Sequence, residues 1–174
     1  MSVILSWDVN PQRSAWSREL LEGIESDWVS LESGSPDKFV FGYSDLSSDN
    51  KKKFWAEIII KMIAFESGFD PHCIYKEPPP LGVDSVGLLQ LSYEDEQHYS
   101  LEPLSREEKS LEDPWVNIRC GLKIFSHWLA RDKVVAQGSG GASRGAARYW
   151  SVLREGQKHH LEEIRSHARA SVGL

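Results

Sequence analysis

The spacing of hydrophobic residues along the chain predicts a mainly α-helical protein. Trp16, Leu20, Ile24 and Trp28 recur every four residues with charged residues between them, which indicates an amphipathic helix over residues 11–31. The stretch that follows is rich in Gly, Ser, Asp and Pro around a short apolar island. It predicts a loop that contains one short extended piece.

A second helix is predicted from about Asp49 to Ser67. Its run FWAEIIIKMIAFES is apolar around most of the helix circumference, as expected of a central buried helix. Gly68 then stops the helix, and Pro71 marks the exit of the chain from it.

Residues 70–92 form a long irregular stretch with three consecutive prolines, and such long loops in compact domains usually carry function. Residues 94–112 are polar and predict one or two short helical turns. Asp113-Pro114 is a typical helix start, and its helix is expected to run to about Arg131. Two more helices are expected over residues 142–153 and 158–170, the last of them polar with its histidines in solvent.

A chain of 174 residues predicts one structural domain. Within it we distinguish an N-terminal helix and loop (residues 1–50) packed on a core (residues 51–154), and a polar C-terminal helix (residues 155–174).

The formal net charge of −6 argues against a nucleic-acid-binding protein, because such proteins neutralise phosphates with basic residues. No apolar run is long enough to span a membrane, so no membrane partner is expected. The segment from Met1 to Trp7 is too short for the core of a signal peptide and no basic region precedes it, so no export signal is visible.

Glu66 is unusual because it closes a helix whose other residues are mostly apolar. Apolar surroundings and the partial negative charge of a helix C-terminus both raise the pKa of a carboxyl group. Such a group can donate a proton near neutral pH and is a candidate general acid. The alternative is a solvated glutamate at a helix end.

Four sequence blocks, in this order, resemble the soluble lytic transglycosylases on the goose-type side of the lysozyme superfamily. They are Glu-Ser-Gly-Phe-Asp-Pro (66–71), Gly-Leu-Leu-Gln-Leu (87–91), Asp-Pro-Trp-Val-Asn-Ile (113–118) with Gly121, and Ala-Arg-Tyr-Trp (147–150). The resemblance covers roughly residues 52–154. It implies a lysozyme-like fold, mainly α, with a small irregular or β-like active-site loop region.

The resemblance also implies roles for individual residues. Glu66 would protonate the glycosidic oxygen and then act as the base. Ser67 would bind the substrate or Glu66, Gln90 would donate to a sugar, and Tyr149 would orient Glu66 or an N-acetyl group. The alternatives are a helix cap for Ser67, an amide that satisfies local backbone for Gln90, and core packing for Tyr149. Only the Tyr of the family's Tyr-Asn-Ala-Gly block is present here, as Tyr149. The resemblance therefore leaves open how this segment would line the family's substrate groove.

The resemblance implies cleavage of peptidoglycan glycan strands without a cofactor or a metal. Glycosidases normally use two carboxyl groups, but Ser92 stands where goose-type lysozymes carry an Asp. Glu77 and Asp84 on the long loop could substitute, although each also fits a surface carboxylate. We therefore favour a lytic transglycosylase over a hydrolytic muramidase. A glycan-binding or inhibitory module without catalysis is the third alternative, against which the intact Glu66 argues.

Cys73 and Cys120 either form a disulfide, which would tie the active-site loop to the core, or remain two free thiols. The cell wall is the expected place of action, whether the protein is periplasmic, secreted or delivered into other cells. A delivered effector would require an immunity or inhibitor protein as a partner.

Overall fold

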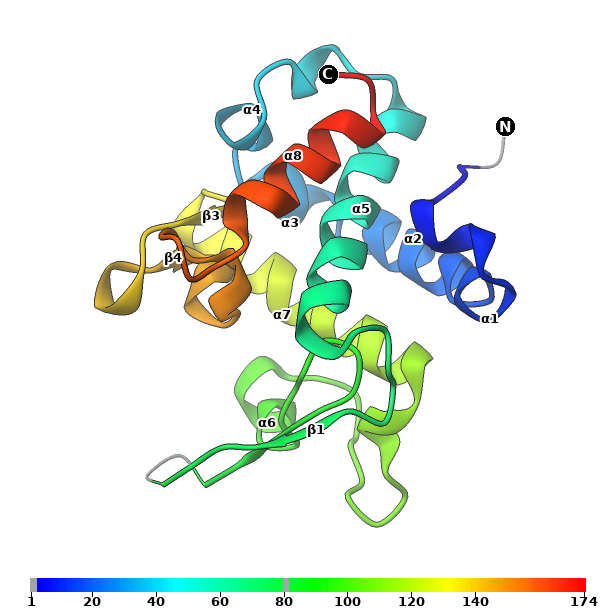
Figure 1. Cartoon of the computed structure of the whole chain (residues 1–174), viewed down its shortest axis with the longest axis vertical. Coiled ribbons are helices and arrows are strands. Elements are labelled where there is room, and N and C mark those ends of the chain that lie inside the picture. Colours follow the sequence, from blue (N-terminus) through cyan, green and yellow to red (C-terminus); the bar gives the residue numbers. More distant parts are fainter. Residues whose placement is uncertain (1–2, 80–81) are drawn as a thin grey trace.

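The computed structural model describes residues 3–79 and 82–174. A long helix, α5 (Ser48–Ser67), runs through its centre, and the other helices surround it (Figure 1). Most side chains of α5 from its second turn onward are buried, among them Phe54, Trp55, Ile58, Ile59, Ile60, Met62 and Ile63. The predicted central buried helix is confirmed.

The predicted amphipathic helix over residues 11–31 is present, but it is divided into three parts. These are α1 (Pro11–Ser14), α2 (Ser17–Ser26) and α3 (Trp28–Glu32). Asp27, with φ −98° and ψ 13°, interrupts the helical backbone between α2 and α3. Trp16, Leu20 and Ile24 are buried, so the apolar face was identified correctly.

The stretch after α3 contains the short helix α4 (Pro36–Phe39) and the 3-10 turn η2 (Tyr43–Asp45). The extended piece predicted here is therefore wrong. The apolar island nevertheless belongs to the core, because Phe39 and Tyr43 are buried and the indole N–H of Trp55 donates to the Tyr43 hydroxyl at 2.9 Å.

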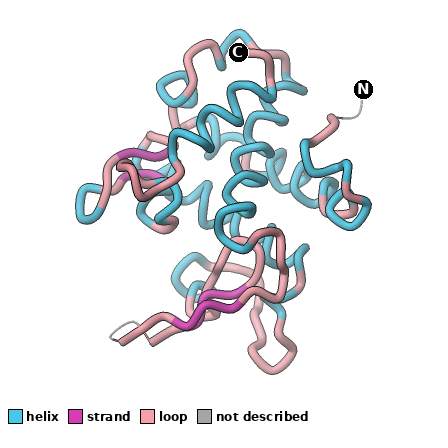
Figure 2. Tube along the Cα trace, viewed as in Figure 1, coloured by secondary structure: helices cyan, strands magenta, loops and turns pink. Residues whose placement is uncertain are grey.

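A small region of irregular structure extends beyond the end of α5. Its strands β1 (Ile74–Lys76) and β2 (Asp84–Val86) form an antiparallel pair, with Ile74 opposite Val86 (Figure 2). The short helix α6 (Asp95–Tyr99) and the 3-10 turn η3 (Ser110–Glu112) follow. The β-like loop region and the short helical turns predicted from the sequence are confirmed.

The second long helix, α7 (Pro114–Asp132), begins and ends as predicted to within a residue or two. The side chain of Asp113 caps it by accepting hydrogen bonds from the N–H groups of Trp115 at 2.8 Å and Val116 at 3.3 Å. Neither α7 nor any other helix in the described parts of the chain is long and apolar enough to cross a membrane.

The helix predicted over residues 142–153 is wrong. This region instead contains a two-residue strand pair, β3 (Ala136–Gln137) with β4 (Arg144–Gly145), and the 3-10 turns η4 (Gly140–Ala142), η5 (Ala146–Arg148) and η6 (Ser151–Leu153). The carboxylate of Asp132 accepts a hydrogen bond from the N–H of Gly145 at 2.7 Å. Gly145 has φ 61°, and a Cβ there would lie 2.4 Å from the carbonyl oxygens of Val134 and Val135. This close approach fixes the backbone of β4 in a region where a helix was expected.

The last helix, α8 (Leu161–Ser171), packs along α5 and buries Leu161, Ile164 and Ala168. The expectation that its histidines are solvated is wrong for His167. Its Nε2 lies 2.7 Å from the carboxylate of Glu57, which is fully buried on α5.

The same carboxylate of Glu57 also binds the N-terminal turn η1 (Ser6–Val9). It accepts hydrogen bonds from the backbone N–H of Ser6 at 2.7 Å and from its hydroxyl at 2.6 Å. One buried glutamate therefore holds an N-terminal and a C-terminal element on the central helix.

Cys73 and Cys120 are free thiols, so the disulfide alternative is not what the structure shows. Their surroundings differ. Cys73 is half-buried beside Gln90 and Glu66, whereas Cys120 is buried in α7 near Glu102 and Arg119.

Candidate active site

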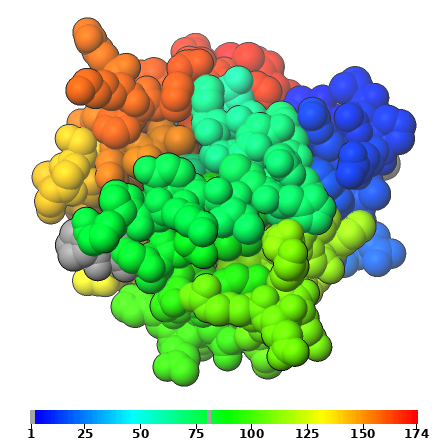
Figure 3. Space-filling view, turned by 60° about the horizontal axis from the view of Figure 1, so that its bottom comes forward, coloured from blue at the N-terminus to red at the C-terminus, as the bar shows by residue number. Residues whose placement is uncertain are grey.

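Glu66 lies in the last turn of α5 and is half-buried. Figure 3 looks onto the face where the end of α5 (teal) lies beside the hairpin region (green) and the η5–η6 segment (orange). Burial raises the pKa of the Glu66 carboxyl to about 7, and the positive charge of Arg154 opposes this only in part. The side chain receives no hydrogen bond from the described residues. Glu66 is therefore a protonated acid up to near-neutral pH, with its oxygens free for a ligand.

Glu57 shows that burial on α5 does not by itself keep a glutamate protonated. Burial raises its pKa, but hydrogen bonds from His167 and Ser6 outweigh that effect and hold the pKa below its ordinary value. Of the two glutamates in the apolar part of the helix, only Glu66 retains its proton.

Ser67 holds the loop that carries Gln90. Its hydroxyl lies 2.9 Å from the carbonyl oxygen of Leu88 and 3.2 Å from that of Ile63. The structure thus assigns the hydroxyl to backbone carbonyls, one in the helix and one in the loop. This contact fixes the distance between the end of α5 and the Gly87–Leu91 loop.

Asn117, fully buried on α7, fixes the same loop from the other side. Its side-chain oxygen accepts from the N–H of Leu89 at 2.9 Å, and its NH2 group donates to the carbonyls of Val86 at 3.0 Å and Leu111 at 2.9 Å. A Cβ on Gly87 would lie 2.3 Å from the Asn117 nitrogen. Glycine is therefore required at position 87, both for this approach and for its φ of 77°.

Two further contacts complete the support of the loop. The indole N–H of Trp150 donates to the carbonyl of Leu89 at 2.9 Å, and the Trp150 side chain is buried. The Leu89 side chain lies against Gly121, where a Cβ would come within 2.2 Å of it. Trp150 is thus a buried support of the loop and has no face free for stacking on a sugar.

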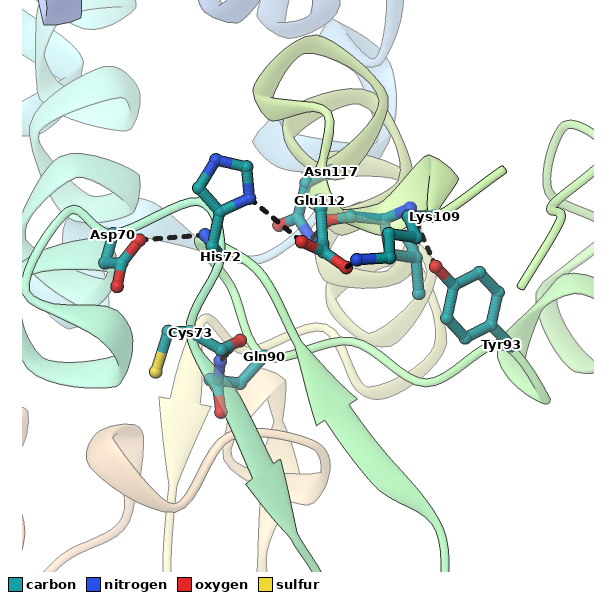
Figure 4. Close-up of polar contacts among 9 residues, drawn as sticks. Asp70, His72, Cys73, Gln90, Tyr93, Lys109, Glu112 and Asn117 are labelled. Atoms are coloured by element: carbon teal, nitrogen blue, oxygen red, sulfur yellow. Dashed lines mark hydrogen bonds and ion pairs between the residues drawn. The ribbon is translucent and has the colours of Figure 1, made fainter. Parts of the chain in front are cut away.

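Gln90 lies beside Cys73 at the base of the hairpin (Figure 4). Its NH2 group donates to the carbonyls of Cys73 at 3.0 Å and Gly87 at 2.8 Å. Its side-chain oxygen has no hydrogen-bond partner among the described residues. In this structure the amide satisfies local backbone, and the oxygen is the atom left for a ligand.

Figure 4 also shows how the turn after α5 is held against η3. The backbone N–H of His72 donates to the Asp70 carboxylate at 2.9 Å. The His72 Nδ1 lies 2.9 Å from the carboxylate of Glu112, and the Lys109 ammonium lies 3.7 Å from the same group. These contacts are on the exposed side of the turn and restrict where the segment leading to Cys73 can move.

Tyr149 follows η5, and its hydroxyl donates to the carboxylate of Asp95. The same Asp95 oxygen accepts from the N–H of Ser92 at 2.8 Å. Burial, together with the Asp95 charge, raises the pKa of Tyr149 well above its ordinary value, so the phenol stays protonated. The structure therefore gives Tyr149 a partner other than Glu66.

The two loop carboxylates proposed as a second catalytic group lie on the hairpin. Asp84 is the first residue of β2 and pairs with Lys76, and Glu77 directly follows β1. The backbone N–H of Glu77 donates to the carbonyl of Val83 at 3.1 Å. Both side chains are half-buried, and neither carboxylate forms a hydrogen bond or ion pair with another described residue.

Residues 46–139, more than half of the chain, match the sequence model described as the transglycosylase SLT domain. The chain belongs to the SLT domain family. Membership supports a lytic transglycosylase-like role on peptidoglycan, and it confirms the lysozyme-like, mainly helical fold expected from the sequence blocks. The match includes Glu66, Gln90 and Asn117.

Three solved structures of the protein DslA resemble this chain over nearly its whole length. The wild-type protein in its form 2 is 34% identical with a TM-score of 0.82, and the match covers 96% of this chain and 95% of that chain. A glutamate-to-glutamine mutant of DslA is 33% identical with a TM-score of 0.83, and the match covers 97% of this chain and 96% of that chain. A second such mutant is 32% identical with a TM-score of 0.76, and the match covers 96% of this chain and 95% of that chain. No curated protein matches the chain.

We expect the rate of the SLT domain to fall as the pH rises through about 7. A general acid must be protonated, and the raised pKa of Glu66 places loss of its proton near that pH. The measurement is the turnover number on soluble glycan fragments between pH 5 and 9. A rate that already falls steeply between pH 5 and pH 6 would contradict the assignment, because a glutamate with the ordinary pKa of 4.5 is mostly ionised there.

Three residues of the site were not singled out from the sequence. Asn117 lies in a recognised block, but nothing in a linear sequence shows that its amide reaches Leu89. Asp95 lies in a polar stretch, where no local signal marks it as the partner of Tyr149. Arg154 directly follows the segment expected to be helical, and its proximity to Glu66 follows from the turns η5 and η6.

Proposed function

We propose that this SLT domain cleaves the β-1,4 bond between N-acetylmuramic acid and N-acetylglucosamine in peptidoglycan, as a lytic transglycosylase that leaves 1,6-anhydro ends. The observation that carries the proposal is the Glu66 carboxyl. It is protonated up to near-neutral pH, receives no hydrogen bond from the described residues, and lies beside a rigidly held loop. A module that only binds glycan has no need of such an acid.

In the proposed reaction Glu66 gives its proton to the glycosidic oxygen, and the bond to the muramic acid C1 breaks. The carboxylate of Glu66 then accepts the proton of the muramic acid C6 hydroxyl, whose oxygen bonds to C1. The C6 hydroxyl belongs to the same sugar, and such intramolecular attack is strongly favoured by proximity. Gln90, through its free side-chain oxygen, would bind a sugar next to the bond that breaks.

Asp95 is the first carboxylate after Gln90 that is half-buried, and its Oδ2 accepts from Ser92 and from Tyr149. These two contacts join the segment after Gln90 to the Tyr149 side chain. We therefore assign Asp95 and Tyr149 a structural role, in which they hold the segment after η5 against the segment after Gln90.

One observation favours a second candidate function, hydrolysis. The two mutated glutamates of DslA are eleven residues apart, and so are Glu66 and Glu77 here. If this spacing marks the same pair of positions, Glu77 on the hairpin would position and activate water, and the products would carry reducing ends.

The products of peptidoglycan digestion separate the two functions. We expect muropeptides with anhydro-muramic ends, lighter by one water than hydrolysis products in mass spectra. We also expect Glu77→Gln and Asp84→Asn to keep the turnover number within about threefold, because neither carboxylate takes part in transglycosylation. Reducing-end products that vanish in Glu77→Gln would overturn the transglycosylase assignment and establish the hydrolase.

We expect the protein to act at the cell wall, whether it is periplasmic, secreted or delivered into other cells. An immunity or inhibitor protein is expected only in the last case.

A further inference from the structure

Arg154 is half-buried and has no acidic partner among the described residues. Arg119 pairs with Glu19 and Glu102, and Arg165 pairs with Glu162. Arg154 uses its Nε to donate to the carbonyl of Ala147 at 3.0 Å. Among the described residues its two terminal nitrogens have neither a hydrogen-bond nor an ion-pair partner. These two nitrogens are not among the buried atoms without a partner, so their N–H donors remain accessible to a ligand.

The fold places this guanidinium next to the catalytic carboxyl. Arg154 follows η6, which packs against α5. The chain then returns to the end of α5, where the His160 ring stacks on Phe65 with ring centres 3.8 Å apart. Phe65 is the neighbour of Glu66 in the sequence, and the charge of Arg154 acts on Glu66 directly.

Glu66 itself does not serve as the counter-ion of Arg154. The two side chains form no ion pair within 4 Å, and the acid must be uncharged when it donates its proton. At the start of a reaction cycle the guanidinium therefore faces a neutral group. Its planar array of N–H donors matches the two oxygens of a carboxylate.

We propose that Arg154 forms a carboxylate-binding subsite beside Glu66, which selects glycan strands whose sugar next to the scissile bond carries a carboxylate-bearing substituent. This inference rests on the proposed function. N-acetylmuramic acid differs from N-acetylglucosamine by a lactyl ether that ends in a carboxyl group. In strands without peptides the lactyl carboxylate itself would bind, and in strands with peptides a carboxylate of the peptide stem would take its place.

The test is binding of three probes to protein that carries Glu66→Gln, which prevents turnover. The probes are a peptide-free tetrasaccharide of alternating N-acetylglucosamine and N-acetylmuramic acid, the same tetrasaccharide with peptide stems, and chitotetraose, which has no carboxylate. Adding Arg154→Gln is expected to raise the Kd of a carboxylate-bearing probe by about tenfold to a hundredfold, as for loss of hydrogen bonds between charged groups. The Kd for chitotetraose is expected to change by less than about twofold.

Two further variants keep the result interpretable. Arg154→Lys retains the charge without the planar donors, so it should lose less affinity than Arg154→Gln. Arg18→Gln removes the same charge from an exposed pair with Glu22 on α2 and should leave all three Kd values unchanged. The probe that responds to Arg154→Gln identifies the source of the carboxylate.

An equal loss for chitotetraose and the carboxylate-bearing probes would overturn the subsite, because Arg154 would then support the fold or Glu66 alone. So would unchanged Kd values for all three probes. If the Glu66→Gln protein binds no probe and the unsubstituted protein releases no muropeptides, the proposed function fails and the subsite falls with it.

Discussion

Glu66→Gln is expected to lower the turnover number on peptidoglycan by about a hundredfold to ten-thousandfold, the range attributed to general acid–base catalysis. The substitution removes the proton donor and changes little volume. The measurement is release of soluble muropeptides by purified protein whose circular dichroism spectrum matches that of the parent. Glu107→Gln, at an exposed position, is the matched control and should retain full activity.

The same variant should change stability in a pH-dependent way. In the folded protein burial raises the Glu66 pKa from its ordinary value of 4.5 to about 7, so the fold disfavours the ionised form. The parent therefore loses stability as the pH rises from about 4.5 to about 7, and the penalty is complete above the folded pKa. Gln cannot ionise, so at pH 8 the variant should be more stable than the parent, by up to about 3 kcal/mol. Equal stability of the two proteins at pH 8, together with full activity of the variant, would refute the role of Glu66.

Asn117→Ala is expected to destabilise the fold by about 3–5 kcal/mol. It leaves one backbone N–H and two backbone carbonyls without their partner in a fully buried place. Urea unfolding followed by tryptophan fluorescence measures the change. Asn117→Asp keeps the volume but turns an oxygen toward the carbonyls of Val86 and Leu111, so it should be at least as damaging.

The half-buried helix cap Asn10 offers the control for Asn117. Its side chain accepts from the N–H groups of Gln12 and Arg13, and Asn10→Ala should cost only about 1 kcal/mol. A cost for Asn117→Ala no larger than this would show that the loop is not fixed by the amide.

The long helices could be predicted from the sequence because local signals agree with their packing. Ser47 and Gly68 bound α5, Asp113 caps α7, and the residues between them are apolar on the faces that are buried. The error at residues 142–153 has the opposite cause. There, the Gly145 N–H donates to the Asp132 carboxylate and the backbone pairs as a strand, and only the folded chain brings these two residues together.

Glu66 could also be identified from local sequence, because it is a glutamate among apolar residues. The same signal at Glu57 was not used. Glu57 stands alone among apolar residues in the sequence FWAEIII, which is as strong a signal of a buried carboxylate as the one that marks Glu66. What separates the two is the partners, His167 and Ser6, which lie far away in the sequence. A linear pattern can therefore nominate buried carboxylates, but it cannot tell which of them has lost its proton.

The attachment of Ser6 and His167 to Glu57 also affects how the protein folds as it leaves the ribosome. Residue 57 emerges long before residue 167, and until then its carboxylate has only Ser6 as a partner. The side of α5 that α8 covers remains in contact with water over the same period. A buried charge without its partner is strongly unfavourable. The nascent chain therefore cannot complete the packing around α5 until α8 has been synthesised, and the face of α5 that α8 covers is prone to aggregation until then.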